Sequence, residues 1–341
     1  MSVDDLWYRD TTGARAVRAA VAPLSWTYGG VVALRNALYD RHVLRAHPGP
    51  VPVISVGNVS VGGTGKTPFS AFIVRELTSA GHTPAVVMRG YGNDELHLHA
   101  RMNAGVLVIT GADRVAGIRK AAAAGADVVV LDDAFQHRRA ARNLDVVLVS
   151  AEGWHDDLRL LPAGPLREPL RSLGRADLIV VTRKIATNER AVAVAQAIRA
   201  AHASAKVAIA ALEPDALILA RGGDSAAVGE LRGARVLAVA GVGDPNSFFA
   251  QLRQLGADVT ALRFRDHHDY TDRDARRIVA EARGHKYVVT TEKDAVKLTN
   301  LWPANATELW YLSQAVRLTE GHSLVASALA NLFKRATSIA E

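Results

Sequence analysis

The stretch Ile54-Ser-Val-Gly-Asn-Val-Ser-Val-Gly-Gly-Thr-Gly-Lys-Thr-Pro68 decides the fold of this chain. An apolar, strand-like segment at residues 51–56 leads into it, and an amphipathic, helix-like segment at about residues 69–80 follows it. A strand, a glycine loop ending in Lys-Thr and a helix together form the arrangement that holds the phosphates of a nucleoside triphosphate. The sequence therefore predicts a phosphate-binding loop at the start of an α/β domain.

The chemistry of such a loop gives each residue a role. Backbone N–H groups and the positive end of the helix approach the phosphates. Lys66 is expected to reach the β- and γ-phosphates, and the Thr67 hydroxyl is expected to bind Mg²⁺. The residues expected to hold the nucleotide are Gly62, Gly63, Thr64, Gly65, Lys66, Thr67 and Pro68.

The loop departs from the usual pattern G-x-x-x-x-G-K-[ST] at one place. Ser60 stands where the pattern has its first glycine, although Gly57 and the later glycines still provide backbone freedom. Val61 stands where the membrane-partitioning ATPases carry a second lysine, which argues against that class. The alternative interpretation is a glycine-rich turn with a chance Gly-Lys-Thr, but the flanking strand and helix favour the phosphate loop.

Composition limits the partners of the protein. The 341 residues include 41 Lys and Arg against 34 Asp and Glu, a formal charge of +7, and this favours anionic partners. Nucleic acid, an acidic membrane surface and phosphorylated substrates all fit, but no nucleic-acid reader motif is present, so we expect no nucleic-acid partner. The absence of cysteine excludes disulfides and thiolate chemistry, and it fits a cytoplasmic protein.

Residues 1–48 are predicted to form a helical arm. No secretory signal is evident, because acidic side chains replace the basic start of such a signal. The nearly uncharged stretch between Arg18 and Arg35 is shorter than the ~20 residues of a membrane span and contains Pro23. Aromatic and arginine side chains in this arm suit a helix in a lipid interface, but they also suit an arm packed on the protein's own core.

Apolar runs then alternate with helix-like segments, which is typical of a parallel sheet with helices on both faces. The first series of predicted strands comprises residues 51–56, 85–88, 106–109, 128–131, 146–149, 178–181 and 206–210. The second series comprises residues 235–239, 259–264, 287–290 and 309–312. We predict two α/β/α domains, at residues 49–212 and 213–317, with crossings near 211–220 and 307–317 and a C-terminal helix within 318–341.

Two carboxylates, Asp132 and Asp133, end a predicted strand at the edge of the sheet where ligands bind. Either can hold Mg²⁺ opposite Thr67. The basic residues 136–139 that follow form either part of a site or a solvated turn.

Asp94 follows another strand end and has the chemistry of a general base, although a surface turn also explains it. Residues 264–270 include His267 and His268, for which a metal site, an acid/base histidine and a structural cluster remain open.

Several segments together resemble one known family. They are Ser55-Val-Gly-Asn-Val-Ser-Val-Gly-Gly-Thr-Gly-Lys-Thr-Pro68, Arg89-Gly-Tyr-Gly92, Asp132-Asp-Ala-Phe-Gln-His137, Leu161-Pro-Ala-Gly-Pro-Leu-Arg-Glu168, Phe264-Arg-Asp-His267 and Thr291-Glu-Lys-Asp-Ala-Val-Lys297. In this order they resemble the tetraacyldisaccharide 4'-kinases, the lipid A 4'-kinases of Gram-negative bacteria. The resemblance implies ATP and Mg²⁺ as cofactors and transfer of the γ-phosphate to an acylated glucosamine disaccharide 1-phosphate. It also implies a peripheral enzyme on the anionic cytoplasmic face of the inner membrane, and no obligate protein partner is expected.

The resemblance also implies roles for individual residues. Asp94 corresponds to a base-like carboxylate, His267 to the histidine that partners it, and Lys66 to the phosphate-binding lysine. The side chains implied to contact the sugar or its phosphate are Arg89, Arg114, Gln136, His137 and Arg167. The chain differs from the family pattern at Asn93, where the family has glycine on a longer segment, which weakens the assignment of Asp94. It also differs at Ala134, which replaces a glycine.

Two other functions fit the same motifs. A soluble phosphate-loop kinase or ligase would bind ATP without a membrane and accept a water-soluble substrate. A nucleotide-switched membrane-binding protein would hydrolyse ATP slowly and carry out no transfer. Substitution of Asp94 or His267 separates the alternatives, because only a kinase loses turnover while it keeps its affinity for ATP.

Overall fold

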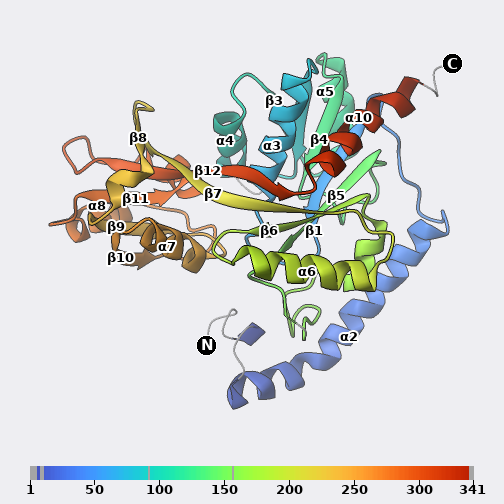
Figure 1. Ribbon diagram of the computed structural model, residues 1–341, viewed down its shortest axis with the longest axis horizontal. Helices are drawn as coiled ribbons and strands as arrows, with labels where there is room; N and C mark the ends of the chain where they lie inside the picture. The colour runs from blue at the N-terminus through green and yellow to red at the C-terminus, as the bar shows by residue number, and fades with distance from the viewer. Residues whose placement is uncertain (1–5, 8–10, 91–92, 156, 338–341) are drawn as a thin grey trace.

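The computed structural model describes residues 6–7, 11–90, 93–155 and 157–337 of the chain. The strands of this part form one 12-stranded sheet with helices on both faces (Figure 1). The strands are β1 (Val53–Asn58), β2 (Pro84–Met88), β3 (Leu107–Thr110), β4 (Val128–Asp132), β5 (Leu144–Ser150), β6 (Leu178–Arg183), β7 (Val207–Leu219), β8 (Ser225–Ala227), β9 (Arg235–Ala240), β10 (Asp258–Arg263), β11 (Tyr287–Thr291) and β12 (Leu309–Glu320). The α-helices are α2 (Thr12–Asp40), α3 (Lys66–Ser79), α4 (Asn93–Met102), α5 (Arg114–Ala123), α6 (Asn188–Ala201), α7 (Pro245–Gln254), α8 (Asp272–Glu281), α9 (Glu292–Leu298) and α10 (His322–Thr337), and two 3₁₀ helices are η1 (Leu170–Arg175) and η2 (Val228–Leu231).

Seven strands form the parallel first half of the sheet, in the order β3-β2-β4-β1-β5-β6-β7. Every residue of β1, β2 and β4 is buried, which is why these strands read as continuous apolar runs. Helices α3 and α10 cover one face, and α5 and α6 cover the other. This arrangement confirms the predicted α/β fold with a phosphate loop between β1 and α3.

Two long strands, β7 and β12, connect the two halves of the sheet. They pair antiparallel from Trp310 opposite Leu219 to Glu320 opposite Ile209. Beyond them, β11, β9 and β10 continue the sheet in parallel, with α7 on one face and α8 and α9 on the other. The predicted crossings are therefore parts of these strands. The predicted domain boundaries, at 212/213 and 317/318, stay a prediction, since each falls inside a strand that both halves share.

Helix α2 lies across the first half of the molecule and projects beyond it (Figure 1). Its N-cap Thr11 accepts a hydrogen bond from the Ala14 N–H, which satisfies one of the open donors of the first turn. Ser25 donates to the Leu160 carbonyl at 3.1 Å, and the Tyr28 hydroxyl donates to the Arg167 carbonyl at 2.9 Å. The predicted N-terminal helix is therefore present and packed on the loop that carries Arg167. No helix in the described part of the chain has the length and apolar character needed to cross a bilayer.

Candidate functional site

The phosphate loop joins the end of β1 to the first turn of α3. Gly62 and Gly65 have φ values of 117° and 82°, which side-chain-bearing residues rarely adopt, and a Cβ on Gly65 would collide with Leu212. The Asn58 amide donates to the Thr64 hydroxyl at 2.9 Å, and the Thr182 hydroxyl donates to the Thr64 carbonyl at 2.9 Å. These contacts hold the loop open at the N-terminus of α3, where backbone N–H groups favour an anion.

Asp132 ends β4 and lies beside the first turn of α3. Its carboxylate accepts hydrogen bonds from the Thr67 hydroxyl at 3.0 Å and the Ser70 hydroxyl at 3.1 Å. His99 of α4 lies 2.8 Å from the same carboxylate and is fully buried. Burial raises the pKa of Asp132, but the hydrogen bond and charge of His99, with the charge of Lys66 and the hydrogen bond of Thr67, hold that pKa below its usual value. The carboxylate is therefore ionised at neutral pH.

The side-chain oxygens of Thr67 and Asp132 are suited to binding Mg²⁺. Thr67 and Asp132 are adjacent, and hydroxyl and carboxylate oxygens are ligands that Mg²⁺ accepts alongside water and substrate phosphates. Within the described residues, no group of three or more His, Asp or Glu side chains is placed to hold a metal ion by itself. Thr67 and Asp132 would leave the other positions around a metal ion to water and nucleotide phosphates.

Asp133 lies between the phosphate loop and a cationic group. Its carboxylate lies 3.0 Å from the Arg167 guanidinium and 3.7 Å from the Lys66 ammonium. Asp133 has a φ of 49°, a left-handed conformation that turns the chain sharply after β4. The structure thus brings together Lys66, Thr67, Asp132, Asp133 and Arg167, which the sequence analysis had assigned to the nucleotide, the metal and the substrate.

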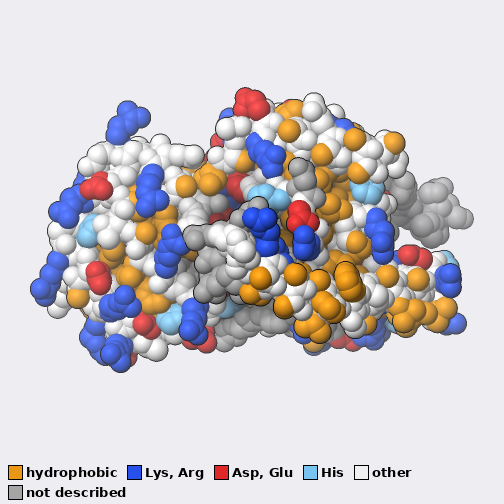
Figure 2. Space-filling view, turned by 90° about the horizontal axis from the view of Figure 1, so that it is seen from below, with side chains coloured by type: hydrophobic (Ala, Val, Ile, Leu, Met, Phe, Trp, Pro, Cys, Tyr) orange, Lys and Arg blue, Asp and Glu red, His pale blue; other side chains and the backbone are white. Residues whose placement is uncertain are grey.

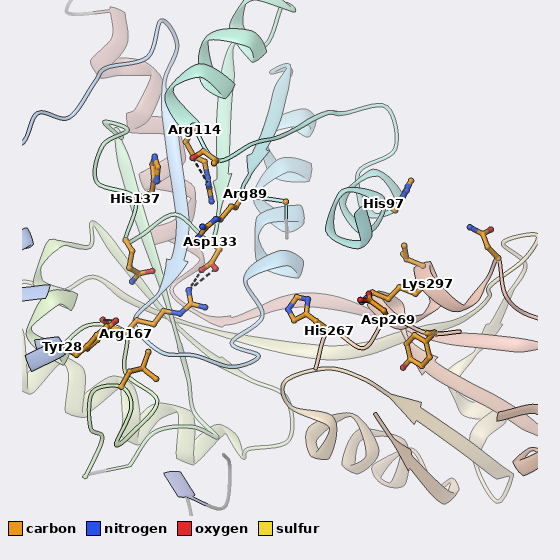
Figure 3. A pocket seen from close by; sticks show the side chains of 17 residues that line it. Tyr28, Arg89, His97, Arg114, Asp133, His137, Arg167, His267, Asp269 and Lys297 are labelled. Carbon is orange, nitrogen blue, oxygen red and sulfur yellow. Dashed lines mark hydrogen bonds and ion pairs between the residues drawn. The ribbon is translucent and has the colours of Figure 1, made fainter. Parts of the chain in front are cut away.

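Two cavities meet at this point. The smaller, of about 360 Å³, is lined by the phosphate loop and by residues of both halves of the sheet. The larger, of about 1530 Å³, contains all five predicted substrate contacts, namely Arg89, Arg114, Gln136, His137 and Arg167. Figure 3 shows Arg89, Arg114, Asp133 and Arg167 together on one side of it, with His267, Asp269 and Lys297 on the other. The residues that line both cavities are Arg89, Asp133, Arg167 and His267.

The wall of the larger cavity is strongly cationic. Burial, together with the charges of Arg114 and Arg142, lowers the pKa of His137 to about 4. The Nε2 atom of His137 is buried and has no hydrogen-bond partner in the described structure. Gln136 donates to the Asn58 carbonyl at 2.9 Å, so it connects this wall to the phosphate loop. The cavity is suited to an anionic group such as a phosphate monoester.

The two predicted catalytic residues of the acceptor side differ in how far they are described. His267 lies on the second half of the sheet, and its Nε2 atom is 3.1 Å from the Lys293 ammonium. The backbone of Asp94 lies in the first turn of α4, but its side chain is outside the described part of the structure. Its role as a base and its partnership with His267 stay predictions.

Some residues of the site were not predicted from sequence. His99 contacts Asp132, and Lys184 and Glu292 line the smaller cavity, at the phosphate loop. The buried carboxylate of Glu168 accepts two hydrogen bonds from the Arg175 guanidinium, at 2.8 and 3.1 Å. Of these four residues, Glu168 and Glu292 belong to sequence motifs, but the motifs did not predict a role for either of them. His99 and Lys184 belong to no motif.

Comparison with known proteins identifies the family. The sequence model of LpxK, described as tetraacyldisaccharide-1-P 4'-kinase, matches residues 17–102 and 93–333. The tetraacyldisaccharide 4'-kinase of Halorhodospira halophila is 39% identical over 351 residues, which cover 96% of this chain and 95% of that protein. The one of Chlorobaculum parvum is 36% identical over 315 residues, which cover 84% and 86%.

A solved structure supports the same relationship. LpxK from Aquifex aeolicus in complex with ATP superposes with a TM-score of 0.74 at 29% identity, covering 93% of this chain and 99% of that chain. Sequence and structure agree over nearly the whole length of the protein. The chain therefore belongs to the tetraacyldisaccharide-1-P 4'-kinase family.

Proposed function

We propose that this protein transfers the γ-phosphate of ATP to the 4'-hydroxyl of tetraacyldisaccharide 1-phosphate, a step of lipid A biosynthesis. The observation that carries the proposal is the junction of the two cavities. Residues Arg89, Asp133, Arg167 and His267 line both the phosphate-loop cavity and the arginine-lined cavity. A donor phosphate on the loop and a phosphorylated acceptor in the larger cavity therefore meet at one place.

The residues present divide the work of phosphoryl transfer. Bound ATP with Mg²⁺ supplies the phosphoryl group and a divalent charge that stabilises the negative charge of the transferred group. Lys66 and the N–H groups of the loop would orient the phosphates, and the adjacent oxygens of Thr67 and Asp132 would hold the metal. Asp94 takes the proton of the 4'-hydroxyl onto its carboxylate as the oxygen forms its bond to phosphorus. ADP then leaves with the former bridging oxygen.

The acceptor end is bound by cations. Arg114 is 4% exposed, and its guanidinium is held by the carbonyls of Gly111 and Ala112, both at 3.3 Å. Arg167 is held at the junction by Asp133. Fixed guanidinium groups match the geometry of a phosphate or of a sugar hydroxyl better than mobile ammonium groups do. The 1-phosphate of the acceptor is the anionic group for which this wall is suited.

We also propose that α2 rests on the anionic cytoplasmic face of the inner membrane. Val17, Leu24 and Val31 recur every seven residues and are 38%, 61% and 62% exposed, while Trp26 is 75% exposed. Figure 2 shows hydrophobic side chains gathered beside Lys and Arg on the lower face of the molecule. Apolar side chains with cationic neighbours suit a helix that lies in a lipid interface.

The experiment is phosphate transfer from γ-labelled ATP to detergent-solubilised tetraacyldisaccharide 1-phosphate. Asp94→Ala is compared with wild type and with Asp258→Ala, which removes an exposed carboxylate at the start of β10. We expect Asp94→Ala to lower kcat on the order of 100-fold or more, because a general base contributes that much, while ATP affinity is unchanged. Labelling by Asp94→Ala at the level of wild type and of Asp258→Ala would reject Asp94 as the base. No labelled lipid from wild type that binds ATP would reject the lipid kinase in favour of a soluble phosphate-loop enzyme or a membrane switch.

A further inference from the structure

A second lysine, Lys184, lies over the phosphate loop. It follows β6 directly, and its Nζ atom is 3.0 Å from the position that a Cβ on Gly63 would occupy. Its side chain is 16% exposed and lines the same cavity as Lys66. The phosphate-loop cavity therefore contains the ammonium group of Lys184 in addition to those of Lys66 and Lys293.

The backbone around Lys184 is held rigidly. One carboxylate oxygen of Glu152 accepts hydrogen bonds from the N–H groups of Lys184, Ile185 and Ala186, at 2.5, 2.9 and 3.0 Å. Thr182, two residues earlier, donates to the Thr64 carbonyl inside the phosphate loop. The turn that carries Lys184 is thus fixed to the loop at one end and to a carboxylate at the other. The backbone that carries this cation is therefore already ordered before an anion binds.

The counter-ion of Lys184 comes from the other half of the sheet. The Asp244 carboxylate lies 3.7 Å from the Lys184 ammonium, and the Cβ of Asp244 lies 3.6 Å from the same Cβ position on Gly63. Asp244 is also the N-cap of α7, where it accepts a hydrogen bond from the Ser247 N–H at 3.2 Å. The Asp244 carboxylate therefore lies beside the loop where a nucleotide places its phosphates. Its negative charge would repel the negative charge of those phosphates.

We propose that Lys184 binds the polyphosphate of the nucleotide and that Asp244 is the counter-ion it exchanges for that polyphosphate. The inference rests on the proposed binding of ATP and adds a binding residue to it. A partly exposed ion pair at 3.7 Å contributes little, whereas a charge-assisted hydrogen bond to phosphate is strong, so the exchange is favourable. Because Asp244 and Lys184 belong to different halves of the sheet, nucleotide binding also releases a contact between them.

The test measures the dissociation constants of MgATP and of inorganic tripolyphosphate with Mg²⁺ by calorimetry. We expect Lys184→Ala to weaken both about tenfold or more, since a hydrogen bond to a charged group is lost. Lys184→Arg keeps the charge and should bind nearly as wild type does. Asp244→Asn should tighten both ligands a few-fold, because asparagine still caps α7 but no longer competes for Lys184. Lys206→Ala, which removes an exposed lysine just before β7 at the opposite edge of the sheet, is the charge-matched control.

The outcomes separate this inference from the function itself. Wild-type protein that binds no MgATP would reject the proposed function. Wild-type binding with an unchanged constant in Lys184→Ala would leave the function and reject the inference. Weaker MgATP binding together with unchanged tripolyphosphate binding would also reject it, because the contact would then be to the ribose or base. Should Lys184→Ala fail to fold, tighter binding by Asp244→Asn still supports the exchange, and unchanged or weaker binding contradicts it.

Discussion

The Nε2 atom of His99 lies 2.8 Å from a carboxylate oxygen of Asp132, and both side chains are buried. The same oxygen accepts the hydrogen bond of Thr67. His99 belongs to α4, and the first turn of that helix carries Asp94. One hydrogen bond therefore joins the helix of the proposed base to the carboxylate proposed to hold Mg²⁺. We infer that His99 is a positioning residue for the proposed metal ligand Asp132.

Replacing His99 tests this relationship. We expect His99→Leu to raise the Mg²⁺ concentration for half-maximal activity by roughly 10- to 100-fold, the range seen when partners of metal ligands are lost. His99→Gln can still donate to Asp132 and should restore most of the wild-type Mg²⁺ dependence. The measurement is a Mg²⁺ titration of phosphate transfer at saturating ATP, with thermal unfolding as a check on folding. A wild-type Mg²⁺ dependence in the leucine variant would contradict the assignment.

Much of the fold follows from local sequence. The buried strands β1, β2 and β4 are short Val- and Ile-rich runs, and their predicted bounds fall within two residues of the observed ones. The long pair β7 and β12 was predicted only in part, with strands at residues 206–210 and 309–312 and crossing segments near 211–220 and 307–317. The residues of β7 are buried near β6 and, apart from Leu217, half-buried or exposed further along, so no single period marks the strand. Its partner also lies about a hundred residues away, as in the contact of Ala216 with Ser313.

The residues of the site likewise fall into those that a local motif predicts and those that it does not. Lys66, Thr67 and Asp132 belong to motifs whose spacing alone predicts chemistry, and the structure brings them together. His99 and Lys184 have no such motif. Each contacts a partner distant in sequence, His99 with Asp132 and Lys184 with Asp244 beside the phosphate loop. A lone histidine on a helix, or a lysine after a strand, gives no local signal of such a contact.

The pKa of His137 reports on the acceptor cavity. It lies at about 4 in the protein alone, because burial and neighbouring arginines disfavour the imidazolium. A bound phosphate monoester adds negative charge beside the ring, so we expect the pKa to rise by at least about one unit. The measurement is a pH titration of the histidine NMR signals with and without the disaccharide 1-phosphate, with His137→Gln to assign the signal. His82, which pairs with Asp127 on the far side of the first half, should not respond. An unchanged His137 pKa at saturating ligand would remove it from the acceptor site.

The exposed face of α2 predicts how the protein meets a membrane. Leu24→Asp places a charge where the wild-type side chain is 61% exposed and apolar. Burying a leucine contributes about 1.5–3 kcal/mol, so we expect the variant to bind anionic vesicles roughly tenfold more weakly or worse. Cosedimentation with phosphatidylglycerol vesicles measures this binding. Leu107→Asp makes the same change at a 39% exposed leucine on β3 and should bind as wild type does. Equal binding by both variants would argue against docking through α2.

The last prediction concerns Glu292, at the start of α9 between the two halves of the sheet. Burial raises its pKa from 4.5 to about 7, although Arg101 and Arg75 act in the opposite direction. The folded protein therefore keeps a proton between pH 4.5 and about 7 that the unfolded chain releases, so this group lowers stability as pH rises through that window.

At pH 8 the buried carboxylate costs at most about 3 kcal/mol of the free energy of unfolding, and Glu292→Gln removes that cost. We expect the glutamine variant to exceed wild type by less than about 1 kcal/mol at pH 5 and by about 2–3 kcal/mol at pH 8. Urea unfolding at the two pH values measures the difference. Glu281→Gln, at the exposed end of α8, is the matched control and should follow wild type at both. A Glu292→Gln difference that stays constant between pH 5 and 8 would show that Glu292 is already ionised in the folded protein at pH 5.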